Sequence, residues 1–394
     1  MYRLAAFLLA ILLAPGLAHA QPTPTVDTDL KADTIDPTMK PLRAHFGGRW
    51  LQNTLMKRDP VTYRKNGAIK LYSLPYYSQT WPGGYIESAF AGTDAYINIY
   101  APNSHYHLIV DGQLAKDITQ PPYGQVEYHI GNLAAGSHTL RLESLNERGG
   151  MDASTTSFFI PRHEKALPAP ARLRQIEIIG DSYAAGYGTV SPKHECTPEE
   201  IRATTDTQIA FGPLVARHFD ADYQVNAVSG IGMVRNYGND PAPVMTALYP
   251  STSLWNKNEK LSDKTWQPQI IVVALGDNDF ATPVAAGEKW ANDDALRDDF
   301  ISTYITFVED LHKQHPKTGF ILMDFNEPNL PSYIDTIIDR LKSDGLTRVL
   351  PYHPGGGAFE QSGCDWHLSP NDHQRLSDGL AAVIDAHPDL WQGQ

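Results

Sequence analysis

The sequence predicts two domains of different class, an antiparallel β-sandwich over residues 41–163 and an α/β domain with a parallel sheet over residues 173–394. Three observations support this prediction. The chain has 394 residues, more than one ordinary domain needs. Its first half shows short apolar segments of period two, typical of antiparallel strands. Its second half alternates strand-like and helix-like segments, which indicates a parallel sheet covered on both sides. The Pro- and Ala-rich stretch 164–172 between them is predicted to be a linker.

The first 20 residues are typical of a secretory signal peptide. Arg3 precedes the apolar run 4–13, and the small residues Ala18 and Ala20 stand at positions −3 and −1 of a cleavage site after Ala20. The apolar run is too short to anchor the chain in a bilayer. We therefore expect export to the periplasm or the medium. Residues 21–40, rich in Pro and Thr, are expected to form a flexible lead-in.

Residues 41–163 contain short segments in which apolar and polar residues alternate, separated by Gly, Asn, Asp and Ser turns. Such spacing without helical periodicity predicts the β-sandwich. The predicted strands include 86–90, 96–100, 107–110 and 139–143, with turns at 103–104, 111–112, 136–137 and 149–150.

Two groups of side chains in this domain have a functional and a plain interpretation. His105 and His107 lie on one face of a strand and resemble half of a metal site. With no third ligand visible we read them as surface residues and expect no metal. Tyr76, Tyr77 and Trp81 fit a carbohydrate-binding surface, but ordinary packing in the sandwich is the favoured interpretation.

The second half carries the chemistry at its strand ends. In a parallel α/β sheet the ligand site lies at the carboxyl ends of the strands. Ser182, Gly230 and Asn278 each follow the end of a predicted strand, so we expect them to share one site. The predicted strands are 175–180, 222–228, 269–275, 319–325 and 347–351, and the predicted helices are 206–219, 296–314, 332–344 and 370–387.

A serine hydroxyl needs a neighbouring base to act as a nucleophile. We assign Ser182 as nucleophile, His367 as base and Asp365 as the residue that orients the imidazole. The backbone N–H groups of Ser182 and Gly230 and the side-chain amide of Asn278 are predicted to form the oxyanion hole. Taken singly, each motif is also compatible with an ordinary turn. Their order along the chain, each at a strand end or helix start, favours a serine hydrolase.

Cys196 and Cys364 are predicted to form one disulfide, because the chain is expected in an oxidising compartment. Cys196 lies shortly after Ser182 and Cys364 shortly before His367, so a bridge would brace the two catalytic loops. Two buried free thiols remain the alternative.

These residues resemble the conserved blocks of the SGNH (GDSL-type) hydrolases, through 180–182, Gly230, 276–279 and 365–367. More narrowly, 182–188, 229–238, 266–268 and 372–374 are similar to carbohydrate esterase family 2, as are 48–50, 110–112 and 136–140 in the first domain. The resemblance implies a jelly-roll domain before a flavodoxin-like hydrolase domain, and removal of O-acetyl groups from plant cell-wall carbohydrate without metal or other cofactor. The chain departs from the family at Leu368, where proline is usual, and at the bulky Tyr183.

For substrate binding we single out Trp366, Tyr183 and Asp279. An indole ring suits the C–H face of a sugar, although Trp366 also fits a packed core position. Tyr183 would line the acyl pocket.

The expected partner is an acetylated polysaccharide or oligosaccharide such as xylan or glucomannan. The formal net charge of −13 opposes binding to nucleic acid or to anionic membranes. A broader SGNH lipase or thioesterase and a non-catalytic carbohydrate-binding protein are the alternatives. The polysaccharide, the acetyl position and the oligomeric state stay open.

Overall fold

The structure is a computed structural model that describes residues 23–29, 38–58, 71–100, 104–119, 126–147, 153–155, 157–254, 258–261, 263–325, 327–355 and 359–392. The predicted signal peptide and its cleavage site lie outside these residues. Among the helices described, none is both long and apolar enough to cross a bilayer.

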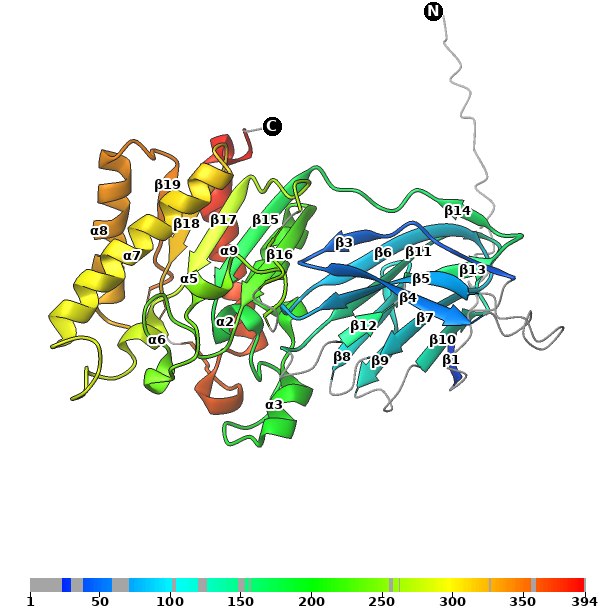
Figure 1. Ribbon diagram of the computed structural model, residues 1–394, viewed down its shortest axis with the longest axis horizontal. Coiled ribbons are helices and arrows are strands. Elements are labelled where there is room, and N and C mark those ends of the chain that lie inside the picture. The colour runs from blue at the N-terminus through cyan, green and yellow to red at the C-terminus, as the bar shows by residue number, and fades with distance from the viewer. Residues whose placement is uncertain are drawn as a thin grey trace, which may run out of the picture.

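Two antiparallel sheets form the first half of the chain (Figure 1). One sheet has the order β1-β10-β7-β12-β5-β4, with β13 and β2 attached at β7, and the other has the order β14-β6-β11-β8-β9, with β3 paired to β6. The strands are β1 Thr25–Asp29, β2 Met39–Pro41, β3 His45–Gly47, β4 Leu51–Arg58, β5 Leu71–Gln79, β6 Tyr85–Gly92, β7 Ala95–Tyr100, β8 His105–Val110, β9 Gln113–Thr119, β10 Val126–Gly131, β11 Gly136–Ser144, β12 Ala153–Thr155, β13 Phe159–Pro161 and β14 Lys165–Leu167.

Alternation along these strands builds a single core between the two sheets. In β8, residues 106, 108 and 110 are buried while 105, 107 and 109 are half-exposed. Leu108 and Leu140 of one sheet pack in the same cluster as Ile97 and Ile130 of the other. The two sheets therefore face each other as the period-two pattern predicts.

Two short strands lie where the sequence predicts no regular structure. Residues 25–29 of the expected flexible lead-in form β1, which pairs with β10 over five residues, and Val26 packs on the core. Residues 165–167 of the expected linker form β14, which pairs with β6. Both strands lie at sheet edges, where backbone pairing to a neighbour outweighs a composition typical of loops.

The second half is a five-stranded parallel sheet of order β16-β15-β17-β18-β19, covered by helices on both faces (Figure 1). Its strands and long helices match the predicted segments to within a few residues. The strands are β15 Arg174–Gly180, β16 Ala221–Ala227, β17 Ile270–Ala274, β18 Gly319–Met323 and β19 Val349–Tyr352. The helices are α2 Ser182–Ala185, α3 Pro198–Thr204, α4 Phe211–His218, α5 Met245–Leu248, α6 Asp277–Phe280, α7 Asp293–Gln314, α8 Leu330–Ser343 and α9 Pro370–Ala386, with short 3₁₀ turns η1 Thr207–Ile209, η2 Tyr237–Asn239, η3 Cys364–Trp366 and η4 Pro388–Trp391.

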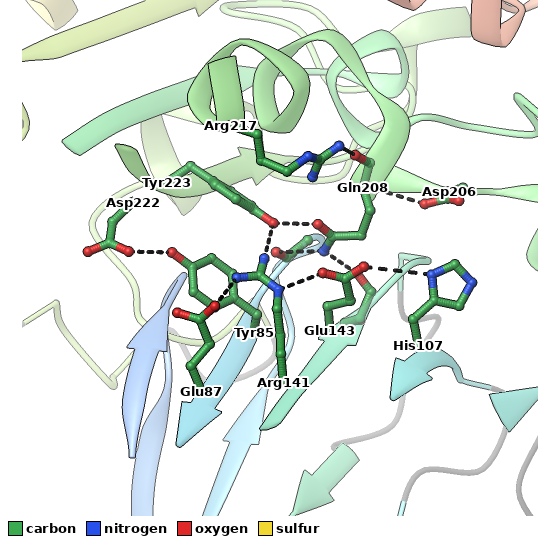
Figure 2. Close-up of polar contacts among 12 residues, drawn as sticks. Tyr85, Glu87, His107, Arg141, Glu143, Asp206, Gln208, Arg217, Asp222 and Tyr223 are labelled. Carbon is green, nitrogen blue, oxygen red and sulfur yellow. Dashed lines mark hydrogen bonds and ion pairs between the residues drawn. The ribbon is translucent and has the colours of Figure 1, made fainter. Parts of the chain in front are cut away.

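A polar cluster joins the two halves (Figure 2). The guanidinium of Arg141 on β11 contacts Glu87 at 2.8 Å, Glu143 at 2.7 Å and the Tyr223 hydroxyl of β16 at 2.6 Å. It also lies 3.6 Å from the centre of the Tyr85 ring. Burial raises the pKa of Glu87, but the hydrogen bond from Arg172 and the charge of Arg141 together hold that pKa below its usual value. Arg141 thus holds buried carboxylates and the edge of the parallel sheet together.

The substitution Arg141→Met should lower the free energy of unfolding by about 3–5 kcal/mol, because it leaves Glu143 and part of Glu87 buried without their cation. The Arg141 side chain is only 13% exposed. Urea unfolding followed by circular dichroism measures the change. Arg297→Met on α7 is the control, since Arg297 pairs only with exposed Asp294 and Asp298 and should cost at most about 1 kcal/mol. Equal costs for the two variants would contradict this role of Arg141.

Candidate active site

Ser182 lies where β15 ends and the one-turn helix α2 begins. Asp181 caps this helix by accepting a hydrogen bond from Tyr183 N at 3.0 Å. Gly186 ends it with φ of 70°, a left-handed conformation that glycine adopts without strain. Ser182 is only 8% exposed and lies at the carboxyl edge of the sheet.

His367 lies on a loop that is attached to the segment after Ser182. Cys364 N donates to Gly188 O at 3.1 Å, and Asp365 N donates to His194 O at 2.7 Å. The predicted disulfide between Cys196 and Cys364 is present. Gly188 has φ of 56°, and a Cβ there would lie 2.4 Å from Cys364 Cβ, so only glycine fits this contact.

Ser182 and His367 therefore lie on segments that are in contact. The ring of Tyr183, the residue after Ser182, lies 5.4 Å from the His367 ring, and the Tyr187 ring lies 4.3 Å from it. The helix that follows His367, α9, begins with a capping box between Ser369 and Asp372, which fixes the end of the loop.

The tautomer of His367 follows from its hydrogen bond to the main chain. Nδ1 lies 2.9 Å from the carbonyl oxygen of Cys364. A carbonyl oxygen only accepts, so Nδ1 carries the proton. Nε2 keeps its lone pair, the form that a general base needs.

The contact with Nδ1 that was expected of Asp365 is made in this structure by the Cys364 carbonyl. The Asp365 carboxylate instead accepts a hydrogen bond from the Tyr187 hydroxyl at 2.8 Å. Asp365 has φ of 50°, a left-handed backbone conformation. The Asp-x-His spacing shows that the two residues are close in sequence but does not fix the backbone between them.

Burial lowers the pKa of His367, and the Cys364 carbonyl and the charge of Asp365 only partly oppose this effect. At a pH equal to the usual pKa of histidine, the imidazole of His367 is therefore mostly neutral. This suits a base that must accept a proton from a serine.

Of the expected oxyanion-hole residues, Gly230 follows β16 and Asn278 follows β17, the two strands that flank β15. Gly230 has φ of 78°, and its carbonyl accepts from Tyr237 N at 2.8 Å. The Asn278 amide nitrogen donates to Asp181 Oδ2 at 3.0 Å and to Ile231 O at 2.9 Å. Both amide hydrogens thus already have acceptors, so donation to an oxyanion requires one of these contacts to be exchanged.

Asp279 does not lie where a substrate-binding residue must. It is fully buried, and its carboxylate accepts the backbone N–H groups of Met233, Val234 and Arg235 at 2.8–2.9 Å. Burial raises its pKa to about 7, against these three donors. Asp279 therefore fixes the loop after Gly230 and does not contact a sugar.

Two large aromatic side chains are exposed beside the site. Trp366 is 64% exposed and stacks on His194 with ring centres 3.7 Å apart, so it is not a core tryptophan. Tyr237, which the sequence analysis does not single out, is 62% exposed. Tyr183 instead packs on Phe325, with ring centres 4.8 Å apart. Trp81 and Tyr77 pack within the protein, which is the ordinary sandwich packing favoured from the sequence.

A carboxylate from the first domain also reaches the site. Glu147, just after β11, accepts a hydrogen bond from Ser229 N at 2.6 Å and another from the Ser229 hydroxyl. Burial raises its pKa, and the two bonds from Ser229 oppose this. Ser229 directly precedes Gly230, so Glu147 holds the oxyanion loop. No local pattern around residue 147 marks this role.

Comparison with known proteins identifies the family. The profile described as "Carbohydrate esterase 2 N-terminal" matches residues 72–170. An "Acetylxylan esterase / glucomannan deacetylase" of Cellvibrio japonicus is 38% identical over 355 residues, which cover 89% of this chain and 93% of that protein. The chain belongs to carbohydrate esterase family 2. It is a carbohydrate esterase with an SGNH-type hydrolase domain, as the sequence resemblance implies.

Solved structures of carbohydrate esterases are similar in fold to this chain. A carbohydrate esterase whose active site "displays divergent catalytic and non-catalytic binding functions" is 36% identical, with a TM-score of 0.77 over 89% of this chain and all of the other. A family two carbohydrate esterase from Clostridium thermocellum in complex with cellohexaose shares the fold, at 23% identity and a TM-score of 0.71 over 88% of this chain and all of the other.

The pH dependence of this esterase should reflect the lowered pKa of His367. The base works when neutral, so kcat/KM falls as the pH drops through the pKa in the folded protein. Because that pKa is lowered, the acidic limb of the profile should lie below pH about 6.5, the usual value for histidine. Rates on a nitrophenyl acetate between pH 4 and 8 measure it, and a limb above pH 7 would contradict the assignment.

The substitution Asp365→Asn should lower kcat by about tenfold or less, because the Cys364 carbonyl selects the tautomer. Where an aspartate selects it, the same change costs about 10⁴-fold. Steady-state kinetics test this, with His367→Gln as the reference for full loss of the base. A drop for Asp365→Asn comparable to that of His367→Gln would restore Asp365 as the orienting residue.

Proposed function

We propose that this family member is an exported serine esterase that removes O-acetyl groups from plant cell-wall polysaccharides, such as xylan or glucomannan, or from derived oligosaccharides. The observation that carries the proposal is a histidine with a free Nε2 on a loop attached beside Ser182. The substrate class rests on the Cellvibrio relative, described as acting on acetylxylan and glucomannan.

The proposed reaction has two steps. Ser182 Oγ attacks the acetyl carbonyl carbon while His367 Nε2 takes the hydroxyl proton. The negative oxygen that forms is met by the N–H groups of Ser182 and Gly230, with Asn278 as the third donor after rearrangement. Collapse releases the sugar hydroxyl, which receives the proton from His367, and leaves acetyl-Ser182. Water then attacks this ester through the same base and releases acetate.

The exposed rings of Trp366 and Tyr237 suit the apolar faces of sugar rings on either side of the acetylated position. Tyr183, next to the nucleophile, would line the acetyl pocket, and its bulk favours a short acyl group. We further propose that the sandwich is a jelly-roll domain over residues 41–163, that the hydrolase domain covers 173–394, and that residues 1–20 direct export. We propose polysaccharide as the binding partner, and we expect no binding to nucleic acid or to membranes.

The substitution Ser182→Ala should reduce acetate release from acetylated xylan and glucomannan by at least about 10³-fold, because it removes the nucleophile. Ser332→Ala, on the exposed face of α8, is the matched control and should retain full activity. Acetate is measured enzymatically, and circular dichroism checks the fold. Wild-type rates in Ser182→Ala would refute the mechanism.

The acyl and sugar specificity needs a separate assay. Nitrophenyl esters of two to ten carbons should show the highest kcat/KM for acetate. A maximum at long chains would instead identify a lipase or thioesterase. Polysaccharide binding without turnover by the wild-type chain would identify a non-catalytic binding protein.

A further inference from the structure

We propose that His105, His107 and Asp117 form a binding site for a divalent transition-metal ion of the zinc class, on the first domain and outside the catalytic centre. The three residues lie on the edge hairpin β8–β9. The structure supplies the third ligand that the sequence pattern lacks.

Strand register brings the three side chains together. His105 and His107 are two apart on β8 and point to the same face of the sheet. Asp117 on β9 is the direct partner of His107 in the antiparallel register. One donor atom from each residue lies within 4.8 Å of the other two, and His105 Nε2 is 2.5 Å from Asp117 Oδ1. A zinc ion held between these three donor atoms would form bonds of about 2.0–2.2 Å to each.

The surrounding charge favours a cation. His107 Nδ1 lies 3.6 Å from Glu143 Oε1, and Figure 2 shows Asp206 of the second domain on the same side. Outer carboxylates of this kind orient histidine ligands in metal sites. The negative charge of these carboxylates would also attract a dication.

In a second cluster of potential metal ligands, a cationic side chain already lies between the carboxylates. Within the described residues, His45, Glu87 and Asp222 meet the same distance criterion. There the guanidinium of Arg172 already bridges the carboxylates, at 2.6 Å from Glu87 and 3.0 Å from Asp222. In the part of the chain that the structure describes, no arginine or lysine forms an ion pair with Asp117. The His105 cluster is therefore the one with room for an added cation.

The ligand set and its exposure define the ion. Two imidazole nitrogens and one carboxylate oxygen suit Zn²⁺ and Co²⁺ better than Mg²⁺ or Ca²⁺, which prefer oxygen ligands. The side chains of His105, His107 and Asp117 are 13%, 23% and 53% exposed, so solvent reaches the cluster and water completes the coordination. A bound ion would tie the edge strand β9 to β8 and so stabilise the first domain.

Calorimetric titration of ZnCl₂ into chelator-treated, untagged full chain tests the proposal. We expect one site, a rise in Tm of about 3–5 °C at saturating Zn²⁺, and the visible absorption of tetrahedral Co²⁺ with CoCl₂. The variants His107→Gln and Asp117→Asn should each weaken Zn²⁺ binding at least tenfold and abolish the Co²⁺ band.

His129→Gln is the matched control. His129 lies in the same domain and pairs with Asp94 at 2.8 Å, but no third donor joins this pair among the described residues. Its Zn²⁺ affinity should equal that of the wild type. The proposal is overturned if wild-type binding is weaker than millimolar, if Asp117→Asn binds as tightly as wild type, or if His129→Gln loses affinity as His107→Gln does. Because none of these readouts uses esterase activity, the result is independent of the proposed reaction.

Discussion

The active site depends on the attachment of residues 363–367 to the segment that follows Ser182. Cys364 is central to this attachment. Its sulfur is bonded to Cys196, 168 residues earlier, its N–H is bonded to Gly188 O, and its carbonyl accepts from His367 Nδ1. One residue therefore attaches the His367 loop to the segment after Ser182 and selects the tautomer of the imidazole. A main-chain carbonyl held from two sides is a more rigid acceptor than a carboxylate on a rotatable side chain, so the base is preorganised without a buried charge behind it.

This arrangement requires backbone strain. Asp365 and Trp366 have φ of 50° and 61°, conformations that cost non-glycine residues about 1–3 kcal/mol each. The hydrogen bond from Asp365 N to His194 O and the bond from Tyr187 to the Asp365 carboxylate offset part of that cost. These two successive left-handed residues turn the chain sharply. The Cys364 carbonyl then faces the imidazole, while the Trp366 ring stays exposed on His194 beside the reacting centre.

Residues whose role follows from local pattern were predictable, and residues whose role depends on long-range contacts were not. The strands β15 and β17 are buried and mainly apolar, so their positions, and hence those of Ser182 and Asn278, follow from the sequence. The strand β16, which precedes Gly230, is buried but carries polar residues at alternate positions, and its bounds were predicted to within one residue. The disulfide follows from the positions of its cysteines relative to Ser182 and His367. The strand β1 does not, because it is held by pairing with β10 and by packing of Val26 on the core, contacts that only the fold provides. Asp279 was placed wrongly because a Gly-Asp-Asn-Asp turn does not show which carboxylate points inward. Glu147 and Asp117 gave no signal, since their partners Ser229 and His107 are identified only by the fold.

The first domain is part of the catalytic architecture rather than a separate module joined by a linker. The segment 145–147 contacts three other parts of the chain. Leu145 N donates to His105 O, Leu145 O accepts from Thr207 N at 2.7 Å, and the Glu147 carboxylate holds Ser229. Since Ser229 precedes Gly230, a residue of the sandwich holds the turn that contains the proposed oxyanion donor. Glu147 is costly to bury, as its raised pKa shows, and the two donors of Ser229 offset this cost only while both domains are in place. In the proposed reaction, the hydrolase domain thus supplies Ser182 and His367, and the sandwich contributes Glu147, which holds the turn that contains Gly230.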